Sequence, residues 1–177
     1  MNYSLIKYGF FFFVITALTG GCKQERPAVS KEEFADTKKR MVEVNKILVR
    51  KDQQIIKGYN ERHELNMKES GTGLWFKVIG KGEGEAAAEG KTATINYKVS
   101  LLDGTECYNS AVDGVKTFTI GRGGVESGLE EGILMLNEGG KAKFIMPPHL
   151  AYGLPGDGDK IPPRAIIVYD VEVVSID

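Results

Sequence analysis

Apolar residues recur at heptad spacing through the first third of the chain, separated by polar and charged positions. The stripe consists of Phe34, Met41, Val44, Leu48, Ile55 and Tyr59. Ser30 precedes it and Glu33 follows three residues later, which is the capping-box signature of a helix N-terminus. The pattern predicts an amphipathic helix of about thirty residues, and Gly58 is a position at which it ends or bends.

Two roles for this helix stay open on the sequence alone. The apolar stripe either packs against the rest of the same chain or pairs with the stripe of a second copy, giving a homodimer. The heptad run is close to the minimum length that indicates a coiled coil, so its spacing favours neither role. The polar, glycine-containing stretch 66–73 then predicts a linker.

Beyond this linker the apolar period becomes that of β-strands. Apolar and polar residues alternate strictly over 93–101, and Asp103-Gly104 follows as a turn. Leu129, Ile133 and Leu136 are spaced by four and three, which predicts one short helix. Further strands are expected at 74–79, 115–120, 141–146 and 165–174. Strands with one short helix indicate an α+β fold.

Composition and charge narrow the class of protein. The 177 residues are 42% hydrophobic and 27% charged, which is typical of a globular domain with an extension. The formal net charge of -1 gives no electrostatic basis for binding nucleic acid. The two cysteines, Cys22 and Cys107, lie too far apart in sequence and context to indicate a disulfide framework.

The first residues are typical of an export signal. Lys7 precedes an apolar run at 10–18, which is too short to predict a membrane span. Small residues then lead into Cys22, and this order is similar to a bacterial lipoprotein signal in which the cysteine is acylated. Thr19 stands where a large aliphatic residue is usual, and the alternative is an ordinary secretory signal with a chance cysteine. Both interpretations predict export.

One long run in the C-terminal half carries a family resemblance. Residues 128–153 read GLEEGILMLNEGGKAKFIMPPHLAYG, with Asn96-Tyr97 before them and IPPRAIIVYD at 161–170 after them. Together these stretches resemble the FK506-binding-protein family of peptidyl-prolyl cis-trans isomerases. The resemblance covers about the last hundred residues, the size of one domain. It implies an antiparallel sheet curled around the short helix, and an activity that needs no metal and no cofactor.

The resemblance also implies a substrate pocket. Its residues fall on Tyr97, Cys107, Tyr108, Phe118, Val125, Glu126, Leu129, Tyr152, Ile161 and Tyr169. The Glu126 backbone N–H and the Tyr152 hydroxyl are implied to hydrogen-bond the bound peptide. The chain departs from the best-known members where Cys107 replaces phenylalanine, Tyr108 replaces aspartate and Leu129 replaces tryptophan. Lys116 also stands where those members carry another aromatic wall residue.

The expected organisation follows from these features. A lipoprotein signal spans 1–21, a tether 22–29, a helical extension 30–68 and the isomerase domain 72–177. This combination is similar to the gliding-motility-associated isomerases of Bacteroidetes. It implies a lipid-anchored isomerase of the cell envelope that acts on prolyl segments of exported proteins. The alternative is a peptide-binding module or chaperone with little turnover.

Overall fold

A computed structural model describes residues 30–177. The predicted signal 1–21, the tether 22–29 and the lipidation site Cys22 lie outside the described residues. Contacts place the boundary between two units at Arg40 and Met41. Helix α1 (Lys31–Arg62) begins in the first unit and ends in the second.

The long helix forms where the apolar stripe predicts it. The Glu33 N–H donates to Ser30 Oγ at 3.1 Å, so the predicted N-cap is confirmed. The helix runs for 32 residues and does not end at Gly58. From residue 41 onward it buries only Asp52 and Ile56. Met41 and Val44 of the predicted stripe are more than half exposed, and so is Ile47, which the stripe did not include.

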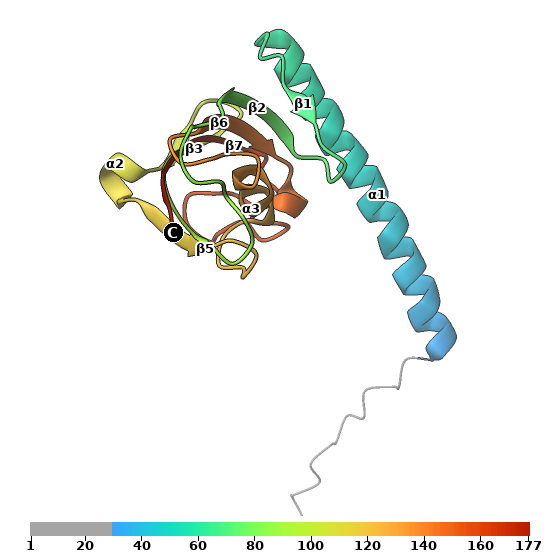
Figure 1. Ribbon diagram of the computed structural model, residues 1–177. Helices are drawn as coiled ribbons and strands as arrows, with labels where there is room; N and C mark the ends of the chain where they lie inside the picture. Colours follow the sequence, from blue (N-terminus) through green and yellow to red (C-terminus); the bar gives the residue numbers. More distant parts are fainter. Residues whose placement is uncertain (1–29) are drawn as a thin grey trace, which may run out of the picture. The chain divides into compact units, whose positions relative to one another are not determined.

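The described residues form one antiparallel sheet of seven strands, which does not close on itself. Its order is β1-β2-β6-β7-β3-β4, and β5 also pairs with β3. The bounds are β1 (Lys68–Glu69), β2 (Trp75–Gly80), β3 (Thr92–Leu101), β4 (Glu106–Asn109), β5 (Lys116–Thr119), β6 (Lys141–Met146) and β7 (Ile167–Ile176). Short helices α2 (Ser110–Asp113), α3 (Ser127–Ile133) and η1 (Pro148–Leu150) complete the described part. Figure 1 shows the sheet curled around α3, so the predicted α+β fold is confirmed.

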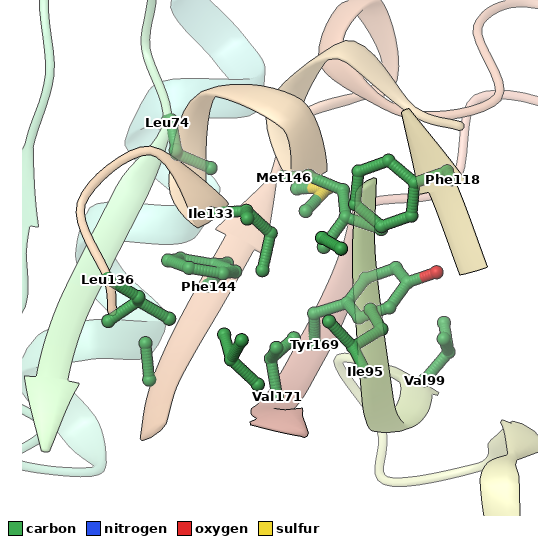
Figure 2. Packing of buried hydrophobic residues seen from close by; sticks show 14 of the residues in the cluster. Leu74, Ile95, Val99, Phe118, Ile133, Leu136, Phe144, Met146, Tyr169 and Val171 are labelled. Carbon is green, nitrogen blue, oxygen red and sulfur yellow. The ribbon is translucent and has the colours of Figure 1, made fainter. Parts of the chain in front are cut away.

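Close packing of α3 on β6 shapes the main core. A Cβ added to Gly132 would lie 2.5 Å from the Phe144 ring, so only glycine permits this approach. Figure 2 shows Ile133 of α3 beside Phe144, with Tyr169 and Val171 of β7 next to them. Ile133, Phe144 and Tyr169 have no exposed surface, which places this part of α3 inside the molecule.

A smaller cluster covers the other face of the sheet. Ile56 of α1 packs there with Trp75, Ile145, Ile166 and Val168. This second cover explains why the last strand begins apolar on both faces. Polar contacts hold the helix to the sheet at the same place, because Gln53 accepts from Trp75 Nε1 at 2.6 Å and donates to the Gly73 carbonyl at 2.9 Å.

A paired charge lies beside this second cluster. The Arg164 guanidinium donates to both carboxylate oxygens of Asp52 at 3.0 Å. Asp52 is 7% exposed, and the two hydrogen bonds account for its burial on the helix. No helix of the described part is long and apolar enough to cross a membrane.

Some predicted boundaries differ from the structure. The last strand spans Ile167–Ile176 instead of 165–174, because Ala165 and Ile166 lie in the loop that follows the turn at the positive-φ residue Arg164. Strands β1 and β4 and helix α2 were not expected. Lys68–Glu69 pairs with β2 inside the expected linker, and Asn109 caps α2 by accepting from the Ala111 N–H.

Candidate functional site

A hollow of about 270 Å³ opens between β5, the loop before α3 and the segment after η1. Lys116 contributes from β5, and Val125 and Glu126 come from the loop that leads into α3. Ala151 and Tyr152 close the opposite side. Gly124 adds backbone only, and its φ of 95° is one that glycine adopts readily.

The structure places the ten residues implied by the family resemblance either in the lining of the hollow or in and against the main core cluster. Three of them, Val125, Glu126 and Tyr152, line the hollow directly. Five belong to the buried core cluster, namely Cys107, Phe118, Leu129, Ile161 and Tyr169. Tyr97 and Tyr108 are half-buried against the same cluster. The set is therefore a single spatial group, although its members are scattered over 73 positions of the sequence, from 97 to 169 counted inclusively.

A charged residue lies inside this apolar group. Glu126 is 7% exposed, and its Oε1 accepts a hydrogen bond from the Tyr169 hydroxyl at 3.0 Å. The Lys116 ammonium donates to the same hydroxyl at 2.8 Å and lies 3.5 Å from Glu126 Oε2. Figure 2 shows the Tyr169 hydroxyl pointing away from Phe144, toward the end of the core where this network forms.

Lys116 also lies over aromatic rings of the group. Its Nζ is 5.0 Å from the centre of the Tyr97 ring and 5.5 Å from that of Tyr169. These are cation–π distances, so the ammonium is attracted to both ring faces. A lysine at this position therefore covers the aromatic wall instead of leaving a gap in it.

The sequence did not reveal this network. The resemblance pointed to the backbone N–H of Glu126 and to Lys116 as a missing aromatic, but not to an interaction between their side chains. The only indication in the sequence was that Glu126, a carboxylate, stands between the apolar residues Val125 and Leu129. A carboxylate placed among apolar positions needs a cation or hydroxyl partner, although sequence does not say which one.

Burial and the Glu126 carboxylate raise the pKa of two tyrosines of this group. Burial is the main cause that raises the pKa of Tyr169, and the Glu126 carboxylate adds to it. Burial also raises the pKa of Tyr152, with a further contribution from Glu126. A tyrosine hydroxyl is protonated at neutral pH even with its ordinary pKa, so these two remain hydrogen-bond donors over a wider pH range than usual.

The rim of the pocket is held by a second carboxylate. Asp157 Oδ1 accepts from the N–H groups of Asp159 and Ile161 at 2.9 and 2.8 Å, which fixes the loop that carries Ile161. The Tyr108 hydroxyl donates to the other oxygen, Oδ2, and this hydrogen bond raises the pKa of Tyr108 to about 12. The tyrosine at this position thus binds a carboxylate supplied from the loop.

Cys107 is a small buried residue. It is 3% exposed, and its Sγ lies 3.6 Å from the Lys160 carbonyl oxygen. Burial raises the pKa of the thiol, so it stays protonated and poorly nucleophilic. His63 and His149 are both exposed.

Comparison with known proteins agrees with this geometry. Residues 83–174 match the family model described as FKBP-type peptidyl-prolyl cis-trans isomerase. The chain belongs to this family. The resemblance inferred from residues 96–170 is confirmed, whereas the likeness to gliding-associated lipoproteins stays a prediction.

Individual relatives show how far the similarity extends. The chain is 39% identical over 122 residues to FkpA, an FKBP-type peptidyl-prolyl cis-trans isomerase of Escherichia coli, which is 68% of this chain and 44% of FkpA. It therefore spans less than half of that relative. It is 36% identical over 106 residues to the FK506-binding protein of Neisseria meningitidis serogroup B, covering 59% of this chain and 96% of that protein.

Solved structures of the same family share the FKBP fold. The crystal structure of Escherichia coli FkpA matches with a TM-score of 0.61 and 34% identity, over 85% of this chain and 74% of FkpA. AtFKBP13 matches with a TM-score of 0.59 and 31% identity, over 63% of this chain and 99% of AtFKBP13. The larger share of this chain that FkpA covers includes residues outside the region matched by the family model.

Proposed function

We propose that this protein is a peptidyl-prolyl cis-trans isomerase that assists the folding of exported proteins. One observation carries the proposal: an FKBP-type domain opens a hollow at the point where Val125, Glu126 and Tyr152 meet. We assign substrate binding to the ten residues that the family resemblance implies, in a domain that spans 72–177. Residues 30–68 form its helical extension.

The proposed chemistry needs no base and no covalent step. Rotation about a prolyl bond is slow because resonance gives the C–N bond partial double-bond character, with a barrier of ~18–20 kcal/mol. A twisted amide has lost that resonance and is less polar than a planar one. Apolar walls such as Val125, Leu129 and Ile161 favour the twisted form over the planar form, because they solvate separated charge poorly.

Two donors are positioned to hold the peptide during rotation. The Glu126 N–H donates to no other backbone group of the described residues, and it stands at the end of α3 that faces the hollow. The Tyr152 hydroxyl stays protonated and lies on the opposite side. Hydrogen bonds from both sides fix the carbonyl groups while the prolyl bond turns.

The test is a refolding assay limited by prolyl isomerisation, which is uncatalysed on a scale of roughly tens to hundreds of seconds. The wild-type protein should accelerate refolding. Tyr152→Phe keeps the ring and removes one donor, so it should lower kcat/KM by about 2- to 10-fold. Tyr59→Phe, which makes the same change on α1, is the control and should match the wild type. No acceleration by the wild type would refute the isomerase proposal.

The alternative function is peptide binding with little turnover. It is favoured by the Lys116–Glu126 pair, which places charge where rotation is assisted by an apolar surface. A binding module would suppress aggregation of an unfolded client without accelerating its proline-limited phase. Measuring both properties on one client separates the two functions.

We also propose that the protein is anchored in the cell envelope through an acylated Cys22. Small residues directly before this cysteine support the proposal. The wild-type protein should be found in the membrane fraction, and Cys22→Ser should release it or leave the signal uncleaved. Cys107→Ser, which changes the other cysteine, should not alter fractionation. Identical processing of wild type and Cys22→Ser would contradict lipid anchoring.

A second copy of the chain is the partner we propose for α1. Met41, Val44 and Ile47 lie within two turns of the helix and are 68%, 54% and 60% exposed. Apolar side chains at heptad-related spacing are stabilised when they are removed from water, and a helix from another copy supplies a matching surface.

A further inference from the structure

One oxygen of Glu126 is buried without a hydrogen bond. Among the described residues, Glu126 Oε2 is the only buried side-chain polar atom that lacks a hydrogen-bond partner. The Lys116 ammonium is 3.5 Å away, which is an ion-pair distance but too long for a good hydrogen bond. A buried acceptor left in this state is costly, so each such atom calls for an explanation.

The position of this oxygen supplies the explanation. It belongs to a residue that lines the hollow, between two other lining residues, Lys116 and Tyr152. The Lys116 side chain is 24% exposed, so its ammonium reaches the opening while the Glu126 side chain, at 4%, lies behind it. A ligand in the hollow therefore meets the Lys116 ammonium first, and it reaches the buried Glu126 oxygen when the flexible lysine side chain moves aside.

We propose that Glu126 and Lys116 determine the substrate specificity of this hollow. They select prolyl peptides in which the residue immediately before the proline has a neutral polar side chain, either a carboxamide or a hydroxyl. The inference rests on the proposed peptide-binding function of this hollow. A carboxamide donates to Glu126 Oε2 through its NH₂ group and accepts from the Lys116 ammonium through its oxygen. The carboxamide thereby gives hydrogen bonds to both side chains, which are too far apart to form a good hydrogen bond with each other.

The same geometry disfavours other side chains. An aliphatic side chain covers the carboxylate and leaves Oε2 unpaired. A lysine on the peptide can pair with Glu126 only while it faces the like charge of Lys116, and a glutamate can pair with Lys116 only while it faces Glu126. Discrimination of this kind arises from buried polar groups that only the right substrate satisfies.

The test compares two peptides that differ in one side chain of equal shape, Asn-Pro and Leu-Pro, together with Lys-Pro and Glu-Pro peptides. Binding to the full-length protein is measured by NMR titration. Isomerisation of the peptides is measured by NMR exchange on the same samples. We expect the wild type to favour the Asn peptide over the Leu peptide by about 5- to 10-fold in binding. The Lys and Glu peptides should bind no better than the Leu peptide.

The double substitution Lys116→Met with Glu126→Met should abolish or reverse this preference. Replacing a buried ion pair by apolar residues of similar volume is often neutral or stabilising, and Glu126 makes no side-chain cap on α3 that would be lost. Lys141→Met with Glu172→Met is the matched control, since that pair is joined at 2.9 Å outside the hollow lining. If the first double variant does not fold, Lys116→Met with Glu126→Gln replaces it and should reduce the preference.

The outcomes separate the inference from the proposed function. If peptides bind with the expected preference but do not isomerise faster, the isomerase proposal fails and the specificity inference stands. If the wild type isomerises the peptides but prefers Leu, Lys or Glu, or if the double variant keeps the Asn preference, the inference is overturned. If none of the peptides binds, both are overturned.

Discussion

Glu126 offers a backbone N–H and a carboxylate at the same point of the pocket, and the two have different origins. The N–H is free because Glu126 precedes the first turn of α3, where helix N–H groups lack intrahelical partners. The carboxylate is tolerated because the Tyr169 hydroxyl and the Lys116 ammonium lie within 3.5 Å. We therefore propose two roles for one residue, in which its backbone binds the prolyl peptide and its side chain selects among substrates.

Tyr108 provides a residue-scale prediction about titration. Its hydrogen bond to Asp157 raises its pKa from 10.0 to about 12. The Cζ signal of ¹³C-labelled Tyr108 should therefore titrate with a midpoint near 12, and Asp157→Asn should return the midpoint toward 10. Because folding raises this pKa, the associated stability is present below pH 10 and is lost as the pH rises through 12.

The control for this titration is Asp159→Asn. Asp159 also lies near Tyr108, but its charge is a smaller cause of the shift than the hydrogen bond from Asp157. Its replacement should move the midpoint only slightly. A wild-type midpoint near 10 would show that the Tyr108–Asp157 hydrogen bond is not maintained in solution.

At the scale of elements, local pattern predicts some strands and cannot predict others. The alternation over 93–101 predicts β3, because one face of that strand is buried and the other is more accessible to solvent. Strand β4 and helix α2 carry no such alternation across 106–113 and exist because β3 and the Asn109 cap supply their partners. The helix stripe was similarly incomplete, since the residue that docks α1 most deeply is Ile56, outside the heptad series.

The same limit applies to the site. The family resemblance supplied ten candidate site residues, and their assignment to the substrate pocket stays a proposal. The Lys116–Tyr169–Glu126 network was not predictable, since its contacts join residues that are 53 and 43 positions apart in sequence. Only the pairing of strands and the angle of α3 bring them within hydrogen-bond reach.

Helix α3 yields a prediction about packing. Gly132→Ala should destabilise the protein by about 1–3 kcal/mol, because the added methyl group overlaps the fully buried Phe144 ring. Gly58→Ala is the matched control inside helix α1. The nearest atom to its new Cβ is the end of the flexible Arg62 side chain at 3.1 Å, so it should stabilise by about 0.5–1 kcal/mol. Urea unfolding measures both changes, and equal effects would contradict the close contact of α3 with β6.

At the scale of the whole molecule, α1 carries two different sets of residues in the part from Met41 onward. One set docks the helix through Ile56 and the Gln53 contacts to Trp75, the only tryptophan of the chain. The other set, Met41, Val44 and Ile47, lies nearer the N-terminus of the helix and is exposed to solvent. We assign packing on the same chain to the first set and propose pairing with a second copy for the other.

Dimerisation through α1 is testable without disturbing the docked face. Val44→Glu with Ile47→Glu places two charges in the proposed seam, so a dimer should dissociate to monomers in light scattering. The emission of Trp75 should stay unchanged, because Gln53 and Ile56 still hold the helix to the sheet. Lys57→Glu also adds a negative charge to α1, at an exposed position on the side away from Val44, and should leave the dimer intact. A wild-type protein that scatters as a monomer across the micromolar range would exclude the seam and leave Met41, Val44 and Ile47 as an exposed surface without a second copy to cover it.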